Sequence, residues 1–505
     1  MYSCVKTCTL YGLDGELVEV EADLSNGLPK FLIVGLPDMA IKESIERVRS
    51  GIKNSGFEFP LKRITINLAP ANLKKDGSQM DLSIAISILS ASSQINEIKE
   101  DYIFLGELSL DGKINSIAGA LPMVISLREK GYKNFIIPYD NRSECSIVKD
   151  VNIYPIKSLY DCVLFLNEEI EIDKYFEEFT YDDEDFDVDF SDMKGQQFLK
   201  RAFEVSAAGF HNILLVGSPG SGKSMAAKRL KTILPKLSFD ESIEVTKIYS
   251  VSNMLKENKL ITTPPFRSPH HTSSAVSLIG GGRIPKPGEI SLSHNGVLFL
   301  DELLEFPKAV LEVLRQPLED KTINIARASA SLTYPSKFIL VGALNPCPCG
   351  YYGDPYHECT CTMSQINKYL SKLSSPLLDR IDIHVEVSPV KYEAISGNSN
   401  EETSKEIRKR VEYAREIQRD RFKDFEINCN SDIKENQIKY FCKLDDKCKN
   451  IMDIAFKKYK FSARTYNKIL KVSRTIADLE GHTDIKESDL LEAIRYRSLD
   501  SKYWS

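Results

Sequence analysis

The chain has 505 residues and a formal net charge of −6, with 42% hydrophobic and 27% charged residues. That length allows roughly two to four domains, and the composition is that of an ordinary globular protein. The net charge gives no sign of nucleic-acid binding. It does not exclude such binding, because much of the acid lies in one segment.

No apolar run is long enough to cross a membrane, and the first residues lack the pattern of a signal peptide. We therefore expect a cytoplasmic protein with no membrane partner. In a reducing compartment the 11 cysteines are expected to be free thiols or metal ligands rather than disulfides.

Residues 1–167 alternate short apolar runs with stretches of helical length. The runs predict strands at 31–36, 63–68, 102–108 and 135–138, and the longer stretches predict helices at 81–91 and 121–131. This alternation predicts a compact α/β domain.

Parts of this first domain, at residues 75–80, 105–112 and 117–119, resemble the proteolytic domain of Lon-type proteases. The resemblance implies a Ser-Lys dyad, whose positions in this chain hold Gln79 and Leu121. A glutamine amide cannot be the nucleophile, and a leucine cannot take up its proton. Ser78 is one residue away from the nucleophile position, and no lysine matches the base position. We therefore expect a Lon-like domain without the dyad, which serves as a platform or a docking module.

Residues 168–192 are rich in aspartate and glutamate. Such a run repels itself and cannot pack a core, so it predicts a solvated linker. The alternative is an acidic stretch that mimics nucleic acid and covers a basic site.

A glycine-rich turn between a predicted strand at 212–216 and a predicted helix organises the rest of the chain. It consists of Gly217, Ser218, Pro219, Gly220, Ser221, Gly222, Lys223 and Ser224. This is the pattern of a P-loop, in which glycines let successive N–H groups face one anion. Lys223 is expected to reach the β- and γ-phosphates of ATP, and Ser224 to bind Mg²⁺. The sequence therefore predicts a nucleoside triphosphatase.

A second apolar run ends in Asp301 and Glu302. After a P-loop, this pair predicts that Asp301 holds the hydration shell of Mg²⁺ and that Glu302 polarises the attacking water as general base. Asn345 follows a further predicted strand at 338–343, where its amide can position the same water.

Two arginines complete the predicted motor. Arg380 resembles the arginine finger that ring ATPases insert toward the γ-phosphate of a neighbouring subunit, and a salt bridge to Asp379 or Asp382 is the alternative. Arg464 begins a long helix and matches a sensor 2 arginine. The order of these motifs predicts an AAA+ core at 193–395, a helical lid at 396–505 and a ring as the functional unit.

Several basic residues are candidates for contact with a nucleic-acid backbone. Residues 321–335 alternate like a hairpin, and hairpins at this point line the pore of several ring helicases. The candidates are Arg283, Lys286 and Arg327, and for each the alternative is a solvated surface cation. The vicinal pair His270 and His271 does not suit a shared metal ion, so a hydrogen-bonding or phosphate-proximal role is expected.

Two Cys-x-Cys pairs bracket a short loop at 347–361 and consist of Cys347, Cys349, Cys359 and Cys361. Four thiolates can hold a tetrahedral Zn²⁺, and His357 could replace one of them. The spacing within each pair is tighter than usual for structural zinc. Free thiols or a redox-labile pair are the alternatives.

The stretches at 268–274, 288–302, 345–350 and 462–465 look like the YifB/ComM family of magnesium-chelatase-like AAA+ proteins. The resemblance covers nearly the whole chain, because the Lon-like half belongs to the same pattern. It implies a hexameric, ATP-driven DNA helicase that promotes branch migration in homologous recombination, known best from natural transformation. Single-stranded or branched DNA and further copies of the chain are the implied partners.

We thus predict an α/β fold with three parts: a Lon-protease-like domain, a P-loop AAA+ core and a helical lid. ATP and Mg²⁺ are the expected cofactors. The sequence leaves open whether the four cysteines also bind Zn²⁺. The rival functions are a magnesium-chelatase-type subunit that powers metal insertion or remodels a protein partner, a nucleotide-dependent scaffold without enzymatic activity, and a Lon-like protease.

Overall fold

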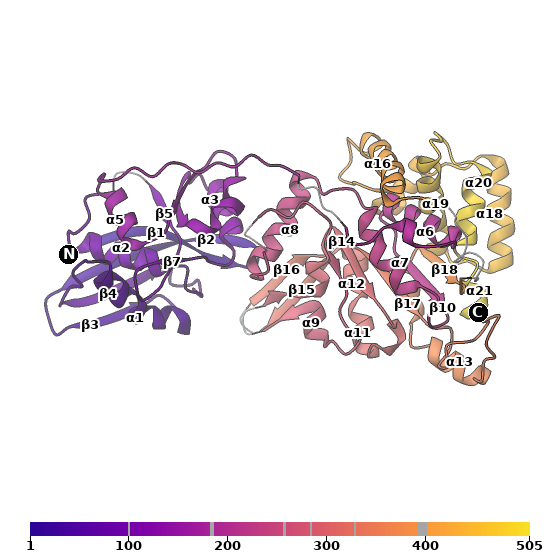
Figure 1. The fold of residues 1–505 in the computed structure, drawn as a ribbon, viewed down its shortest axis with the longest axis horizontal. Helices are drawn as coiled ribbons and strands as arrows, with labels where there is room; N and C mark the ends of the chain where they lie inside the picture. The colour runs from indigo at the N-terminus through magenta and orange to yellow at the C-terminus, as the bar shows by residue number, and fades with distance from the viewer. Residues whose placement is uncertain are drawn as a thin grey trace. The chain divides into compact units, whose positions relative to one another are not determined.

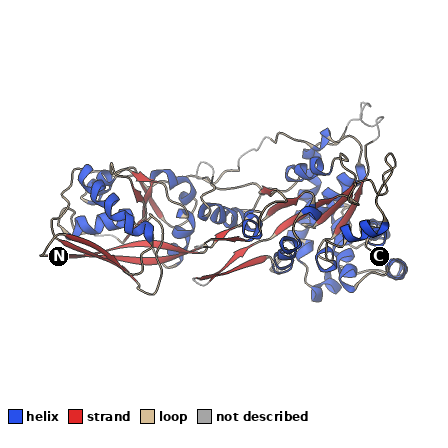
Figure 2. Ribbon diagram, turned by 90° about the horizontal axis from the view of Figure 1, so that it is seen from below, coloured by secondary structure: helices blue, strands red, loops and turns tan. Residues whose placement is uncertain are grey.

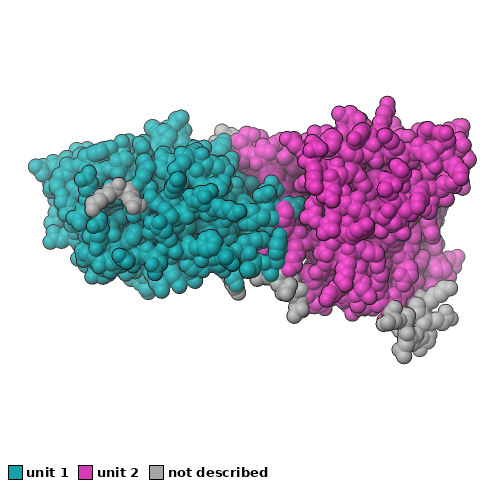
Figure 3. Space-filling view, turned by 90° about the horizontal axis from the view of Figure 1, so that it is seen from above, with its two compact units in different colours: residues 1–182, 239–261 teal, residues 183–238, 262–505 magenta. Residues whose placement is uncertain are grey.

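The computed structural model describes residues 1–98, 101–181, 186–255, 259–282, 285–327, 330–390 and 401–504. Packing divides the chain into two compact units, which Figure 3 shows in different colours. Unit 1 contains residues 1–182 and 239–261, and unit 2 contains residues 183–238 and 262–505. The finer division predicted from the sequence, with boundaries after residues 167, 192 and 395, stays a prediction.

Unit 1 is built on a mixed seven-stranded sheet with the order β3-β4-β2-β1-β5-β8-β9. Its strands, with the separate pair β6 and β7, are β1 (Tyr2–Tyr11), β2 (Asp14–Ser25), β3 (Lys30–Val34), β4 (Arg63–Ala69), β5 (Tyr102–Phe104), β6 (Glu107–Leu108), β7 (Ile114–Asn115), β8 (Asn134–Pro138) and β9 (Asn152–Ile156). β1, β2 and β4 pair antiparallel, whereas β5, β8 and β9 run parallel. In β2, alternate residues from Val18 to Leu24 are buried, as expected when one face of a sheet covers a core.

The helices of unit 1 lie along this sheet (Figure 2). They are α1 (Met39–Asn54), α2 (Asp81–Ala91), α3 (Ala120–Glu129), α4 (Arg142–Ser146), α5 (Leu159–Leu166) and α8 (Phe239–Val251). α2 packs on β1 and β2 and is buried at every residue except Ser90. A mostly apolar helix that is buried on all sides lies inside a core, so α2 anchors this unit.

α8 belongs to unit 1 although it follows the glycine-rich turn in the sequence. It packs against α3, and the backbone N–H of Gly119 at the start of α3 donates to the carbonyl oxygen of Ser250 (3.1 Å). The residues of unit 2 that flank the segment 239–261 lie together, because the N–H of Leu237 donates to the carbonyl oxygen of Thr262 (3.0 Å). The chain therefore leaves unit 2 and returns to it at one place.

Unit 2 contains a parallel five-stranded sheet with the order β11-β14-β17-β10-β18 (Figure 1). The strands of this unit are β10 (Ile213–Gly217), β11 (Phe266–Arg267), β12 (Gly280–Gly281), β13 (Lys286–Pro287), β14 (Gly296–Leu300), β15 (Thr322–Arg327), β16 (Ala330–Pro335), β17 (Phe338–Leu344) and β18 (Ile383–Val387). Every residue of β10, β14 and β17 is buried. Continuous apolar runs of this kind are typical of central parallel strands that are covered on both faces.

The helices of unit 2 are α6 (Gln197–Gly209), α7 (Lys223–Arg229), α9 (Ala275–Ile279), α10 (Glu289–Leu292), α11 (Lys308–Val313), α12 (Arg315–Asp320), α13 (Met363–Leu370), α14 (Ser375–Leu378), α16 (Ser404–Arg421), α17 (Glu435–Phe441), α18 (Asp446–Tyr459), α19 (Ala463–Leu479), α20 (Glu487–Arg495) and α21 (Asp500–Tyr503). From α16 onward the described chain is helical, and α19 packs against α6, α16 and α20. The apolar side chains of these helices share one core with those of the sheet.

These elements confirm the predicted mixed α/β fold with a helical C-terminal region. The predicted strand at 102–108 is wrong in one respect, because it is split into β5 and β6. The backbone N–H of Gly106 donates to the carbonyl oxygen of Gln79 (2.9 Å), which takes the chain out of the sheet at that point. No described helix combines the length and the apolar character that crossing a bilayer requires.

Candidate functional site

The glycine-rich turn connects β10 to α7, as the sequence predicted (Figure 1). Gly220 and Gly222 have φ values of 76° and 90°, which lie in the left-handed region that residues with a Cβ atom seldom adopt. Gly222 is the N-cap of α7, so the helix begins at Lys223. The turn thus has the strand, loop and helix context that a P-loop requires.

The Lys223 ammonium group lies inside the turn and donates to the carbonyl oxygens of Gly217 (2.7 Å) and Ser218 (2.9 Å). It also contacts the amide oxygen of Asn345 at 3.3 Å. Burial lowers the pKa of Lys223 to about 8, and the nearby Asp301 carboxylate partly opposes this shift. A phosphate group would supply the anion that a buried ammonium group favours.

Strand order brings the other predicted residues to the same edge of the sheet. β17 lies between β10 and β14, and parallel strands place their carboxyl ends together. Asp301 follows β14 and Asn345 follows β17. The Ser224 hydroxyl donates to the Asp301 carboxylate at 2.6 Å, so the two proposed Mg²⁺ ligands are adjacent. A hydroxyl and a carboxylate at the mouth of a P-loop are oxygen donors of the kind that Mg²⁺ prefers.

Glu302 adopts an unusual backbone conformation directly after Asp301. Its φ of 49° lies in the left-handed region, and its carboxylate is 3.0 Å from Nδ1 of His271. Strained backbone of this kind persists only where the surrounding structure holds it, and it is common at active sites. His271 is therefore a direct partner of the predicted general base.

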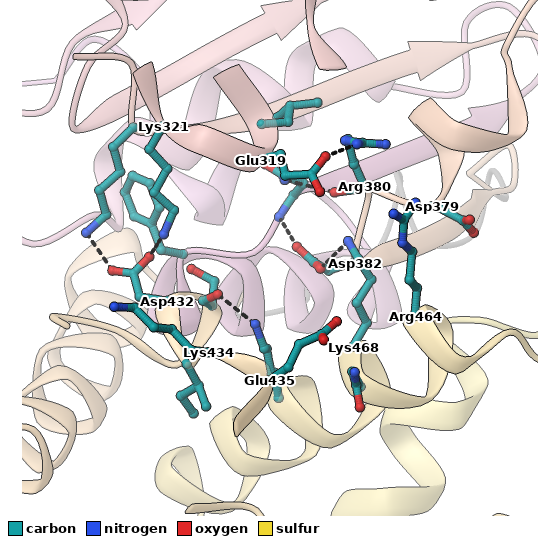
Figure 4. A pocket seen from close by; sticks show the side chains of 18 of the residues that line it. Glu319, Lys321, Asp379, Arg380, Asp382, Asp432, Lys434, Glu435, Arg464 and Lys468 are labelled. Carbon is teal, nitrogen blue, oxygen red and sulfur yellow. Dashed lines mark hydrogen bonds and ion pairs between the residues drawn. The ribbon is translucent and has the colours of Figure 1, made fainter. Parts of the chain in front are cut away.

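Arg380 and Arg464 line a cavity of about 460 Å³ in unit 2 (Figure 4). Among the described residues, its lining includes both arginines and no residue of the P-loop. Arg380 forms an ion pair with Glu319, rather than with Asp379 or Asp382, and donates to the carbonyl oxygen of Pro376 (2.6 Å). Burial, followed by the charge of Arg464, lowers the pKa of Arg380. The two arginine side chains thus lie in the same cavity.

The four loop cysteines gather at one point. The sulfur atoms of Cys347, Cys349, Cys359 and Cys361 all lie within 4.8 Å of one another. His357 is not among them, since its Nδ1 is 3.2 Å from Asp354 and its ring lies 4.7 Å from the ring of Tyr351. A metal site here would have four sulfur ligands.

The predicted nucleic-acid contacts are only partly described. The hairpin of β15 and β16 is present, with Thr322 paired to Pro335 and Arg327 to Ala330. Lys286 is exposed in β13, which pairs with β12. Arg283 and the side chain of Arg327 lie outside the described residues.

Neither dyad position in unit 1 holds a group suited to proteolysis. The Gln79 amide is buried and donates to the carbonyl oxygen of Asp76 (2.6 Å), and Leu121 is buried in α3. Ser78 donates to the Glu107 carboxylate, and the nearest lysine in sequence, Lys75, bonds to the carbonyl oxygen of Pro70.

Three family models match the chain. The model described as "Magnesium chelatase, subunit ChlI" covers residues 189–395. "Subunit ChlI of Mg-chelatase" covers residues 20–141, and "Magnesium chelatase, subunit ChlI C-terminal" covers residues 401–497.

Similar proteins match over almost their whole length. "Competence protein ComM" of Haemophilus influenzae is 42% identical over 495 residues, which cover 97% of this chain and 96% of that protein. YifB of Escherichia coli is 39% identical over 501 residues, or 99% of this chain and 97% of that protein. The chain belongs to the ComM/YifB family of magnesium-chelatase-like AAA+ proteins.

The N-terminal part of this ComM/YifB chain is also similar to Lon. A Lon protease of Buchnera aphidicola subsp. Baizongia pistaciae is 25% identical over 174 residues, which cover 32% of this chain and 22% of that protein. Together with the AAA+ match, this likeness confirms the predicted combination of a Lon-like N-terminal region with an AAA+ core. AAA+ proteins are a class of ATPases.

Some contacts at the site of this ComM/YifB chain go beyond the sequence motifs. The sequence indicated a hydrogen-bonding role for the histidine pair, but not that His271 faces Glu302. It also did not show that the cysteine loop packs on the P-loop, where a Cβ atom on Gly350 would come within 2.6 Å of Pro219. Both contacts join segments distant in sequence, and no local pattern encodes them.

Proposed function

We propose that the protein is a ring-forming, ATP-driven motor that moves DNA, a helicase that promotes branch migration during homologous recombination. The observation that carries this proposal is the convergence of Lys223, Ser224, Asp301, Glu302 and Asn345 at one edge of the parallel sheet. The name of the Haemophilus relative, a competence protein, supports a role in natural transformation.

Each residue at this edge has a distinct chemical task. Lys223 binds the β- and γ-phosphates, and its contact with the Asn345 amide supports a role for that amide beside the transferred group. Ser224 and Asp301 hold Mg²⁺, which neutralises phosphate charge when it is bound. Glu302 takes the proton of the attacking water, and Asn345 orients that water.

The arginine cavity supports hydrolysis between subunits. Arg380 and Arg464 share this cavity, whose lining lacks the P-loop, so we propose that both arginines act on the nucleotide of a neighbouring copy. The neighbour's γ-phosphate then replaces Glu319 as the partner of Arg380. A closed ring, proposed as a homo-hexamer, gives every subunit such a neighbour.

The proposed DNA contact lies on the hairpin of β15 and β16 and the neighbouring β12–β13 pair. Exposed Lys286 contacts the phosphate backbone, as do Arg283 and Arg327. Phosphate contacts of this kind carry no sequence preference, which suits a motor that moves along DNA. The Lon-like region is proposed to be a docking platform rather than a protease.

The test is the ATPase rate of the purified protein alone, with single-stranded DNA and with a synthetic four-way junction. We expect stimulation by DNA that is strongest with the junction, and no turnover in Glu302→Gln, which should retain ATP binding. Equal rates with and without every DNA would overturn the helicase assignment. Normal hydrolysis by Glu302→Gln would refute its role as general base.

The second candidate function is a magnesium-chelatase-type motor that inserts a metal ion or remodels a protein partner. The three magnesium chelatase family models favour it. It predicts an ATPase that ignores DNA and responds to a protein or tetrapyrrole partner. The same assay therefore separates the two functions.

A further inference from the structure

The cysteine loop, residues 346–361, brings its sulfur atoms to the distances of a metal site. Cys347 Sγ lies 3.3 Å from Cys349 Sγ and 3.7 Å from Cys359 Sγ, and the last two are 3.6 Å apart. Tetrahedral zinc with Zn–S bonds of about 2.3 Å sets its sulfur atoms about 3.8 Å apart, whereas a disulfide requires about 2 Å. The observed spacing fits four ligands around one ion.

The loop backbone supports this arrangement. The N–H of Tyr352 donates to Cys347 Sγ (3.3 Å), and the N–H of Gly350 donates to the carbonyl oxygen of Cys347 (3.0 Å), which closes a tight turn that contains the first pair. N–H groups that point at sulfur stabilise a thiolate and fix its direction. Four soft thiolate ligands in tetrahedral reach favour Zn²⁺ over hard cations such as Mg²⁺.

The same loop packs directly on the P-loop. Gly350 touches Pro219 so closely that a Cβ atom there would come within 2.6 Å of the proline ring. Ser218 of the P-loop and Asp354 of the cysteine loop line the same small pocket. Cys347 lies only two residues after Asn345, which contacts Lys223. The loop thus joins the end of β17 to the phosphate-binding turn.

We propose that the four cysteines bind one Zn²⁺ and that this metal holds the cysteine loop against the P-loop, so that ATP affinity depends on the metal. Without the metal, the two Cys-x-Cys pairs lose their shared ligand, and the contact of Gly350 with Pro219 loosens. The metal site is independent of the proposed function, whereas its effect on ATP rests on it.

The first test is metal analysis of the full-length protein, purified without chelator. We expect about one zinc ion per chain, and loss of that zinc in Cys349→Ser and Cys359→Ser. Cys4→Ser, which changes an exposed cysteine of β1, is the matched control and should keep the metal. Protein exchanged with Co²⁺ should show the absorption of tetrahedral thiolate cobalt.

If the wild type is isolated without metal, quantitative alkylation of its cysteines decides between free thiols and a redox-labile pair. Protein that is isolated without metal, with all four thiols alkylated and no cobalt spectrum, would overturn the zinc site in favour of free thiols. A disulfide within the loop in freshly isolated, metal-free protein would overturn it in favour of a redox pair.

The second test concerns the coupling to ATP. Gly350→Ala leaves all four cysteines in place but adds a Cβ atom that would come within 2.6 Å of Pro219, at a backbone φ of 88° that itself disfavours alanine. It should retain zinc and bind ATP about tenfold more weakly. Removal of zinc from the wild type should weaken ATP binding similarly, and added Zn²⁺ should restore it. Unchanged ATP affinity in both cases would overturn the coupling. If DNA does not change the ATPase rate, the helicase assignment is wrong, but the measured zinc content per chain is unaffected.

Discussion

Glu302, the proposed general base, pairs with His271 in the structure. The left-handed backbone turns its carboxylate toward His271, and the side chain of Glu302 is 55% exposed. A general base acts only when it faces the attacking water. We therefore propose that the contact with His271 competes with the role of Glu302 as general base, and that breaking it favours the catalytic orientation.

Replacement of His271 by alanine tests this competition. His271→Ala should raise the ATPase rate without DNA by about two- to fivefold, since an exposed pair of this kind is worth at most about 1 kcal/mol. His270→Ala is the control, because His270 bonds to Thr272 and its ring lies 4.1 Å from that of His271, but within the described parts of the chain it pairs with no carboxylate. A fall in the rate of His271→Ala at unchanged ATP affinity would mean that His271 instead orients Glu302 for catalysis.

At the scale of elements, two distant segments meet to form the arginine cavity. Arg380 follows the short helix α14, and Arg464 lies in the first turn of α19, where Ser462 caps the helix by accepting from the N–H of Thr465 (3.1 Å). Lys468, one turn along α19, forms an ion pair with Asp382 at 2.7 Å. This pair ties the helical region to the loop that carries Arg380, as Figure 4 shows.

Mixing two inactive variants tests whether this cavity serves a neighbour. Lys223→Ala lacks the lysine that we propose binds phosphate, and Arg380→Ala lacks the arginine that we propose acts on the neighbour, so each variant alone should be nearly inactive. In an equal random mixture, about a quarter of the interfaces pair an intact P-loop with an intact Arg380, and ATPase activity should partly return.

The matched control mixes Arg380→Ala with a Lys223→Ala/Arg380→Ala double variant, which offers no intact arginine. Mixed rings that regain nothing above this control would place the action of Arg380 within its own subunit.

At the scale of the whole molecule, α8 contributes a hydrogen-bond partner to a buried acid of α4 in unit 1. Glu144 accepts hydrogen bonds from Asn141 (2.6 Å) and from Ser250 of α8 (2.8 Å). Burial nevertheless raises the pKa of Glu144 from 4.5 to about 7. Between these pH values the folded unit holds a proton that the unfolded chain has released, so the free energy of unfolding falls as pH rises through this window.

Glu144→Gln should remove this dependence. The variant should resemble the wild type near pH 4.5 and become more stable than it as pH rises to 7, by at most about 3 kcal/mol, and the gain should persist above pH 7. Hydrogen exchange in peptides from α3 and α4, compared at each pH, reports on this unit.

Glu129→Gln, at an exposed site of α3, is the control. A constant difference between Glu144→Gln and the wild type at all pH values would show that Glu144 does not titrate in this range.

The sequence predicts most residues of the candidate nucleotide site at the edge of the parallel sheet, because each motif there is local. Apolar runs marked β10, β14 and β17, and the residue types after them indicated Lys223, Asp301 and Asn345. The β1–β2 hairpin was not predicted, although the alternation in β2 was readable. The placement of α8 and the contact between the cysteine loop and the P-loop depend on tertiary packing, which a motif does not reveal.

The excursion through α8 means that the Lon-like region is not a removable module. A truncated protein that starts after residue 182 would still carry α8 but not its partner α3, and would expose side chains such as Val245 and Ile248 that are buried in the intact chain. Loss of activity in such a truncation would thus report on a damaged surface rather than on the role of the missing part. A clean excision would also remove residues 239–261, and the hydrogen bond between Leu237 and Thr262 shows that a short bridge could close that gap.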